Sequence, residues 1–264
     1  MDFKYVNFKK KYGQNFLVDK NIVKKIVNSI EILPSSLVIE IGCGDGKLTQ
    51  ELCSNFDYVL GYEIDNELRD YLLNNLNDYN NYKIIFSDFM KSDILSDIKE
   101  INFDNLYVVA NLPYYITTPI LSKIITSKLG VKEIYVMVQK EVSDRFSAKI
   151  GSKDYGSLSV YLNYYFDIKK LFDVNRNSFV PKPNVDSSIV CFKEKKEKKN
   201  VENEELFFKL VRDSFQFKRK TLRNNLKDYN LEKIEKTLSK YNLDLSVRAE
   251  NLSLDIFIDI ANNL

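Results

Sequence analysis

Leu37-Val-Ile-Glu-Ile-Gly-Cys-Gly-Asp-Gly46 is the stretch around which the rest of the chain is organised. Residues 37–41 are mostly apolar and predict a buried strand, and three glycines at alternate positions predict a tight turn into a helix. The spacing is G-x-G-x-G, which differs from the G-x-G-x-x-G fingerprint of dinucleotide-binding sites. Because glycines let a backbone approach a ligand closely at the first strand-helix turn, we expect a ligand site here.

On both sides of this stretch, strand patterns alternate with helix patterns. Helices are expected at 19–30, 47–54, 66–77, 118–127 and 142–149, and strands at 37–41, 58–62, 83–86, up to 111, 133–138, 157–166 and 187–192. Residues 193–205 have no aromatic residue and no periodicity, and short helices are expected after them at 206–215, 221–226, 231–241 and 254–261. The fold class is therefore α/β, a Rossmann-like doubly wound sheet with a mixed edge and a small C-terminal all-helical domain. The expected domains are 1–193 and 194–264.

Polar residues stand at the carboxyl ends of three further expected strands. Glu63, 21 residues beyond Gly42, is placed to accept hydrogen bonds from both hydroxyls of a ribose. Asp88 is placed to accept a proton of an adenine amino group. At the end of the fourth strand, Asn111-Leu-Pro-Tyr114 combines an amide, a proline that stops ladder pairing and an aromatic ring, which indicates a pocket for a nucleobase. The alternative is that these are ordinary turn residues and exposed acids.

The composition excludes several kinds of chemistry. The chain has no histidine, so Ser-His and Cys-His catalysis and His-ligated metal centres are ruled out. Cys43, Cys53 and Cys191 form no Cys-x-x-Cys pair, which argues against a disulfide framework or a zinc site. No apolar run approaches the roughly 18 residues of a membrane span, and the start has no apolar signal region. A cytoplasmic protein without a membrane partner is expected.

The net charge of +2 conceals two basic segments. Residues 1–25 hold seven Lys and two Asp, and residues 193–225 hold eleven Lys or Arg and six Asp or Glu, so each segment carries +5. Binding of a polyanion such as RNA explains this distribution, because basic side chains that neutralise phosphates release counterions. Solvated surface charge is the alternative.

Six motifs spread along nearly the whole chain resemble one known family. They are KYGQNFLVD at 11–19, EIGCGDG at 40–46, NLPYYITTPI at 111–120, FVPKPNVDSSIV at 179–190, FKRKTLRNNL at 217–226 and RAENLS at 248–253. The glycine spacing resembles that of S-adenosylmethionine-dependent methyltransferases, and the six motifs together resemble the rRNA adenine N6,N6-dimethyltransferase family. Within it, the chain looks most like the bacterial enzymes that dimethylate two adjacent adenosines in a hairpin near the 3′ end of small-subunit rRNA.

The resemblance implies a role for each matching residue. S-adenosylmethionine is the implied methyl donor, with no metal, and its site is implied to be lined by Asn15, Leu17, Gly42, Gly44, Glu63, Asp88 and Asn111. The target base is implied to be held by Asn111, Leu112, Pro113 and Tyr114, with Phe179 on its other face. Phosphates of the RNA are implied to contact Lys9, Lys10, Lys11, Lys218, Arg219, Lys220 and Arg223.

The implied partner is small-subunit rRNA within an immature small ribosomal subunit, bound by a monomer. Two positions depart from the usual pattern: Tyr115 stands where Asn is common, and Asn184 stands where Lys is common, which removes one phosphate contact. The rival readings are a large-subunit rRNA adenine methyltransferase of the type that gives macrolide resistance, and a non-catalytic ribosome-assembly factor. The NLPY form, the FVPKPNVDS loop and the RAENLS tail favour the small-subunit enzyme.

Overall fold

A computed structural model describes residues 14–111 and 116–264 of the chain. The described residues divide into two compact units, one within Met1–Ser143 and Lys169–Lys193, the other made of Asp144–Ile168 and Glu194–Leu264. The second unit thus takes a segment before residue 169 in addition to the chain after 193. The domain boundaries expected from the sequence, 1–193 and 194–264, stay a prediction.

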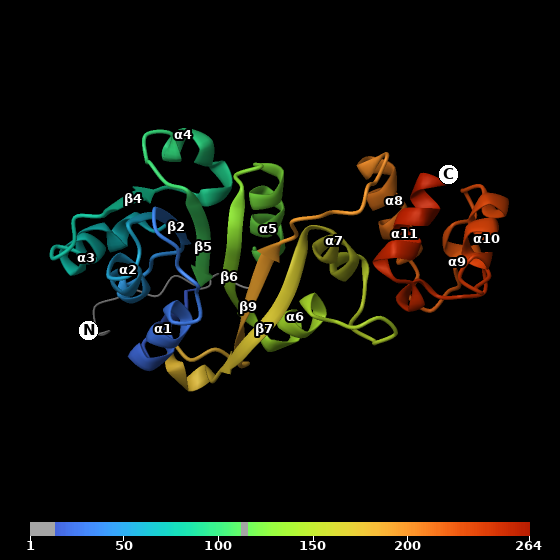
Figure 1. The fold of residues 1–264 in the computed structure, drawn as a ribbon. Helices are drawn as coiled ribbons and strands as arrows, with labels where there is room; N and C mark the ends of the chain where they lie inside the picture. The colour runs from blue at the N-terminus through green and yellow to red at the C-terminus, as the bar shows by residue number, and fades with distance from the viewer. Residues whose placement is uncertain (1–13, 112–115) are drawn as a thin grey trace. The chain divides into compact units, whose positions relative to one another are not determined.

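The first unit is built on a sheet whose strands run in the order β4-β3-β2-β5-β6-β9-β7 (Figure 1). The strands are β2 (Ser36–Ile41), β3 (Tyr58–Glu63), β4 (Tyr82–Phe86), β5 (Asn105–Asn111), β6 (Val131–Gln139), β7 (Phe166–Val174) and β9 (Ser187–Glu194). Neighbours from β4 to β6 pair in parallel, whereas β9 pairs antiparallel with β6. The expected α/β sheet with a mixed edge is confirmed. Because β2 pairs with β3 on one side and β5 on the other, strand order reverses at β2, and such a switch point opens a crevice at the carboxyl ends.

Helices and short 3₁₀ turns connect these strands. They are α1 (Lys20–Val27), α2 (Lys47–Cys53), η3 (Asn66–Leu68), α3 (Arg69–Asn75), η4 (Phe89–Lys91), α4 (Ile94–Ile98), α5 (Thr117–Thr126), α6 (Lys140–Phe146) and η5 (Arg176–Ser178). A small second sheet pairs β1 (Phe16–Leu17) antiparallel with β8 (Phe179–Val180), which ties the start of the described chain to the segment before β9.

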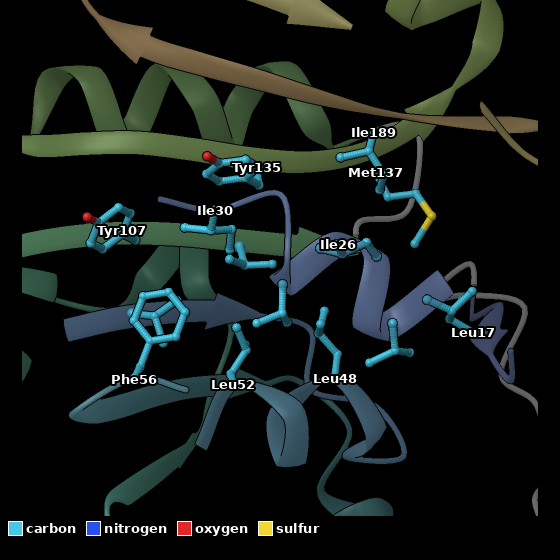
Figure 2. Packing of buried hydrophobic residues seen from close by; sticks show 14 of the residues in the cluster. Leu17, Ile26, Ile30, Leu48, Leu52, Phe56, Tyr107, Tyr135, Met137 and Ile189 are labelled. Atoms are coloured by element: carbon cyan, nitrogen blue, oxygen red, sulfur yellow. The ribbon is translucent and has the colours of Figure 1, made fainter. Parts of the chain in front are cut away.

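One face of the main sheet packs against α1 and α2. Ile26 of α1 and Leu52 of α2 are 2% and 0% exposed, and they meet Tyr107 of β5 and Tyr135 of β6 in one apolar cluster. Figure 2 shows these side chains converging from the two helices and the strands. At about 25 cal/mol per Å² of apolar surface removed from water, burial of this kind is the main stabilising term of the unit. The two helices thereby hold the loop between β2 and α2 in place.

The second unit is a cluster of helices. Besides α7 (Ser157–Tyr165) it contains α8 (Glu204–Ser214), α9 (Leu222–Asn225), α10 (Leu231–Ser239), η6 (Ala249–Asn251) and α11 (Leu254–Asn262). Phe207, Leu238 and Phe257, all 0% exposed, belong to its apolar core. The expected helical C-terminal region is confirmed.

The strand expected at 157–166 is wrong, because residues 157–165 form helix α7. Apolar residues at 158, 160, 162 and 164 alternate as in a strand, but Val160 and Tyr164 also stand four positions apart, on one face of a helix. Both side chains are buried in the helical core, where the Tyr164 ring lies 5.3 Å from that of Phe207. Contacts with the rest of this unit decide in favour of the helix. The strand of this region, β7, begins only at Phe166.

Candidate functional site

A glycine loop follows β2 at the switch point of the sheet. Gly42, Gly44 and Gly46 have φ angles of +83°, +57° and +82°, in the left-handed region that favours glycine. A Cβ atom on Gly42 would lie 3.4 Å from the Asn111 carbonyl oxygen, and one on Gly44 would lie 3.1 Å from the Phe16 ring. The loop backbone therefore passes close to the end of β5 and to the Phe16 side chain of β1.

Glu63 closes the end of β3 beside this loop. Its side chain is buried, and its two carboxylate oxygens accept hydrogen bonds from the backbone N–H groups of Gly44 and Asp65, each at 2.8 Å. Burial raises the pKa of Glu63, while the two backbone donors act in the opposite direction. Each oxygen keeps a lone-pair site, so the carboxylate can still accept bonds from a ligand.

Asp88 follows β4 and caps the short helix η4. Its Oδ1 accepts a hydrogen bond from the Met90 backbone N–H at 2.9 Å, and its side chain is half-buried. Lys123 of α5 holds the same turn, because its Nζ donates to the carbonyls of Phe89 and Ser92, both at 2.6 Å. The position of Asp88 is thus fixed from two elements.

Asn111 is the last residue of β5, directly beside the glycine loop. Its Nδ2 is oriented toward the carbonyl oxygen of Asn15, at 3.5 Å, which links the end of β5 to the segment before β1. With the amide nitrogen directed there, the Oδ1 atom is left to accept a hydrogen bond from a ligand.

These elements enclose a narrow pocket. It is lined by Phe16, Leu17, Glu40, Gly42, Cys43, Gly44, Asp45, Leu48 and Asn111. The pocket therefore brings together Leu17, Gly42, Gly44 and Asn111, which the sequence analysis selects as cofactor residues. Glu63, at the end of β3, and Asp88, after β4, do not line it, and Glu63 is joined to it through the Gly44 N–H.

Glu40 is a pocket residue that sequence reasoning missed. Its side chain is 0% exposed, and among the described residues neither carboxylate oxygen has a hydrogen-bond partner. Burial raises its pKa to about 8, the nearby Thr49 hydroxyl and Cys43 thiol act against this, and Glu63 and Asp45 raise the pKa further. The available signal was a single acid inside the apolar run at 37–41, since unpaired buried acids are rare outside functional sites.

Asp45, which pairs with Lys47, also lines the pocket and was missed, and two further missed residues, Phe16 and Leu48, are apolar. The ring of Phe16 covers the glycine loop, and Leu48 of α2 forms part of the pocket wall. Ile64, next to Glu63, is 42% exposed at the carboxyl end of β3. An exposed apolar side chain beside a ribose-type acceptor offers a surface for a flat base.

The remaining candidate residues do not all meet at this pocket. Leu112, Pro113, Tyr114 and Tyr115, with Lys9, Lys10 and Lys11, lie outside the described residues. Phe179 is 3% exposed in β8 and packs in the apolar cluster, so its contact with a base stays a prediction. Lys218, Arg219, Lys220 and Arg223 are exposed in the second unit. Asn184 is exposed, and its carbonyl accepts from Arg176 Nη1 at 2.8 Å.

Within residues 14–111 and 116–264, no group of three or more Cys, Asp or Glu side chains is arranged to hold a metal ion. In the same described part of the chain, none of the helices has the length and hydropathy needed to span a membrane.

The sequence matches the profile of the Ribosomal RNA adenine dimethylase family over residues 5–264. It is 43% identical to ribosomal RNA small subunit methyltransferase A of Geobacillus sp. strain WCH70, over 98% of this chain and 92% of the relative. It is 45% identical to the protein of the same name from Streptococcus gordonii, over 97% and 92%.

Solved structures agree with this likeness. A dimethyladenosine transferase from Plasmodium falciparum superposes with a TM-score of 0.78 at 28% identity, covering 93% of this chain and 95% of that one. The 23S rRNA methyltransferase ErmE superposes with a TM-score of 0.74, covering 95% and 99%, but at 24% identity it supports the fold alone.

Proposed function

The chain belongs to the ribosomal RNA adenine dimethylase family, and from this premise we propose that it dimethylates N6 of two adjacent adenosines in the 3′-terminal hairpin of small-subunit rRNA. The methyl donor is S-adenosylmethionine. One observation carries the proposal: the glycine loop and Asn111 meet in one pocket at the switch point of a sheet, in a chain whose relatives at 43% and 45% identity are small-subunit methyltransferases. The reaction contributes to biogenesis of the small subunit.

The described residues fit this methyl donor. Gly42 and Gly44 bring bare backbone to the ligand, as a cofactor that lies along the loop requires. Glu63 would accept hydrogen bonds from the two ribose hydroxyls at the lone pairs that its bonds to the Gly44 and Asp65 N–H groups leave open. Asp88 would accept a hydrogen bond from the adenine amino group. Asn15 and Leu17 close the site from the β1 side, where Asn15 already contacts Asn111.

The charge of the site also fits. S-adenosylmethionine supplies an electrophilic methyl group on a positively charged sulfonium. Glu63 places a carboxylate beside the pocket, whereas Glu40 keeps its proton at neutral pH because burial raises its pKa to about 8, and Asp45 pairs with Lys47. A carboxylate beside a poorly hydrated pocket favours a cationic ligand over its neutral product, because its interaction with charge is weakly screened there.

Asn111 is proposed to activate the target nitrogen together with Leu112. An adenine N6 lone pair is delocalised into the ring and is a poor nucleophile. Hydrogen bonds from the two N6 N–H groups to the Asn111 Oδ1 and the Leu112 carbonyl oxygen favour a pyramidal, more nucleophilic nitrogen. Pro113 and Tyr114 are proposed to hold the base, with the Tyr114 ring stacked on it for in-line attack and Phe179 on its other face. The alkylated nitrogen is acidic and loses its proton to water, so a chain without histidine suffices.

The target base has to leave its stack to reach this pocket. Extrusion of a base costs a few kcal/mol and least where the base is already unpaired, which favours a hairpin loop as substrate. The proposed phosphate contacts are Lys9, Lys10, Lys11, Lys218, Arg219, Lys220 and Arg223. We propose that the substrate particle is an immature small subunit in the cytoplasm and that the protein acts as a monomer.

The rival functions predict different products. A large-subunit enzyme would share this pocket, so the pocket does not distinguish the two reactions. The names of the relatives and the motifs outside the pocket favour the small-subunit reaction. A non-catalytic assembly factor does not need the pocket, whereas this chain has the glycine loop, Glu63 and Asn111 in place.

The test is methyl transfer from labelled S-adenosylmethionine to immature small subunits and, in parallel, to large-subunit rRNA, with modified nucleosides identified by mass. Dimethyladenosine in the small-subunit 3′ hairpin is the expected product. Label in large-subunit RNA alone would identify the resistance-type reaction. No label in either, from protein that binds small subunits, would support the assembly factor.

A further inference from the structure

The turn between α8 and α9 presents an exposed aromatic ring. Phe217 is 56% exposed. Among the large hydrophobic side chains exposed in the described part of the chain, only Phe217 and Tyr241 are aromatic, and the Tyr241 hydroxyl is hydrogen-bonded to Asp259. Exposure of a ring to water forgoes the stabilisation that its burial would give, so a ring held outward invites a functional explanation.

The backbone around Phe217 is held in place by a buried amide. Asn225 is 8% exposed, and its Oδ1 accepts from the Phe217 N–H at 3.2 Å. Its Nδ2 donates to the carbonyls of Ser214, at 2.7 Å, and Phe217, at 3.3 Å. The Phe217 carbonyl also accepts from the Lys220 N–H at 2.8 Å. A ring on a turn of this kind loses little conformational freedom when it binds a partner.

Three basic residues follow the ring in the sequence. Lys218, Arg219 and Lys220 follow it directly, and within the described residues none of the three forms an ion pair with a carboxylate. Lys218 Nζ donates to the carbonyl of Lys153. Arg223 lies 3.5 Å from Glu235 across exposed surface, a contact that contributes little. The turn therefore combines positive charge with one flat apolar ring.

We propose that Phe217 stacks on an unpaired base of bound RNA while the neighbouring cations hold the flanking phosphates. The inference rests on the proposed function, which makes RNA the partner. A basic surface that also presents an exposed aromatic ring suits single-stranded nucleic acid, because the cations contact phosphates and every base has a face on which the ring can stack. A duplex hides these faces, and a second copy of this chain would bring the same cations to the contact.

The chain has no tryptophan, so Phe217→Trp introduces a single indole at the proposed contact. The probes are a single-stranded oligoadenylate and a duplex of the same length, added to the full chain. Single-stranded RNA is expected to quench the indole fluorescence, and the duplex is expected to leave it unchanged. Phe217→Ala is expected to weaken single-strand binding about tenfold, and Phe217→Tyr to retain it.

Leu95→Trp is the matched control. Leu95 is 57% exposed, close to the exposure of Phe217, but it lies in α4 between Asp93 and Asp97. An indole there is expected to keep its fluorescence when RNA is added, because like charge repels the phosphates. Phe217→Ala is also expected to leave the salt dependence of binding unchanged, since it removes no cation.

Equal quenching at both positions, or equal weakening of single-strand and duplex binding by Phe217→Ala, would overturn the stacking assignment. So would an unchanged single-strand affinity. Methyl transfer by the same preparation separates this result from the proposed function. A protein that methylates small subunits but shows no Phe217-dependent quenching refutes the stacking alone, whereas quenching without methyl transfer refutes the enzyme assignment alone.

Discussion

Replacement of Glu40 by Gln is expected to make the protein more stable in alkaline solution. The Glu40 carboxyl is fully buried, its oxygens have no hydrogen-bond partner within residues 14–111 and 116–264, and burial raises its pKa from 4.5 to about 8. In the unfolded chain the group loses its proton above about pH 4.5, whereas in the folded protein it keeps the proton up to about pH 8. The folded state therefore binds more protons in this window, and stability falls as the pH rises through it.

The size of the effect follows from the width of the window. Each pH unit between the two pKa values changes the free energy of unfolding by about 1.4 kcal/mol, and the change levels off above the folded-state pKa. Between about pH 6 and pH 9 the wild type is therefore expected to lose about 3 kcal/mol through Glu40 alone. Gln is nearly isosteric with the protonated acid, so the stability of the variant is expected to match that of the wild type only below about pH 4, and to exceed it by about 2 kcal/mol near pH 6 and by about 5 kcal/mol near pH 9.

Urea unfolding followed by circular dichroism at both pH values measures this difference, and titrations shared by the two proteins cancel. Glu133→Gln is the matched control. The Glu133 side chain is also buried, but it accepts from the Tyr135 hydroxyl at 2.6 Å and pairs with Lys193 at 2.9 Å, so its loss is expected to lower stability at both pH values. If the free energy of unfolding of Glu40→Gln changed with pH as that of the wild type does, the Glu40 carboxyl would have to be ionised in the folded wild type. That result would refute the reasoning.

Asn111→Ala is expected to abolish methyl transfer and to leave RNA binding intact. Asn263→Ala, at an exposed site near the C-terminus, is the control and is expected to retain both activities. Normal methyl transfer by Asn111→Ala would remove Asn111 from the mechanism. Tyr114→Ala is expected to lower kcat far more than S-adenosylmethionine affinity, and equal losses in turnover assays and calorimetry would contradict its assignment to the base. Gly44→Ala and Gly130→Ala place a side chain at φ angles of +57° and +67°, so each is expected to lower the free energy of unfolding by roughly 1 kcal/mol. Only the Gly44 variant is also expected to weaken S-adenosylmethionine binding, because its Cβ meets the Phe16 ring at 3.1 Å. RNA affinity is expected to fall steeply with salt, and a flat response in filter binding would show that the basic segments do not contact phosphate.

The sequence by itself determined the sheet, the helical C-terminal region and four of the nine residues that line the pocket, Leu17, Gly42, Gly44 and Asn111. Strands such as 37–41 and 58–62 are short apolar runs that end at Gly, Glu or Asn, and these patterns depend on local backbone preference and burial alone. The family resemblance implied one cofactor site for Gly42 and Asn111, and the two residues line one pocket because the carboxyl ends of neighbouring parallel strands share one edge.

Only the tertiary structure decided the features that depend on distant partners. Residues 157–165 satisfy a strand pattern and a helix pattern equally, and packing of Val160 and Tyr164 in the helical core selects the helix. The isolation of Glu40 and the contact of Phe16 with Gly44 arise from segments far apart in the chain, whose approach no local pattern encodes. Local preferences act over a few residues, whereas burial and hydrogen-bond partners are set by the whole packed unit.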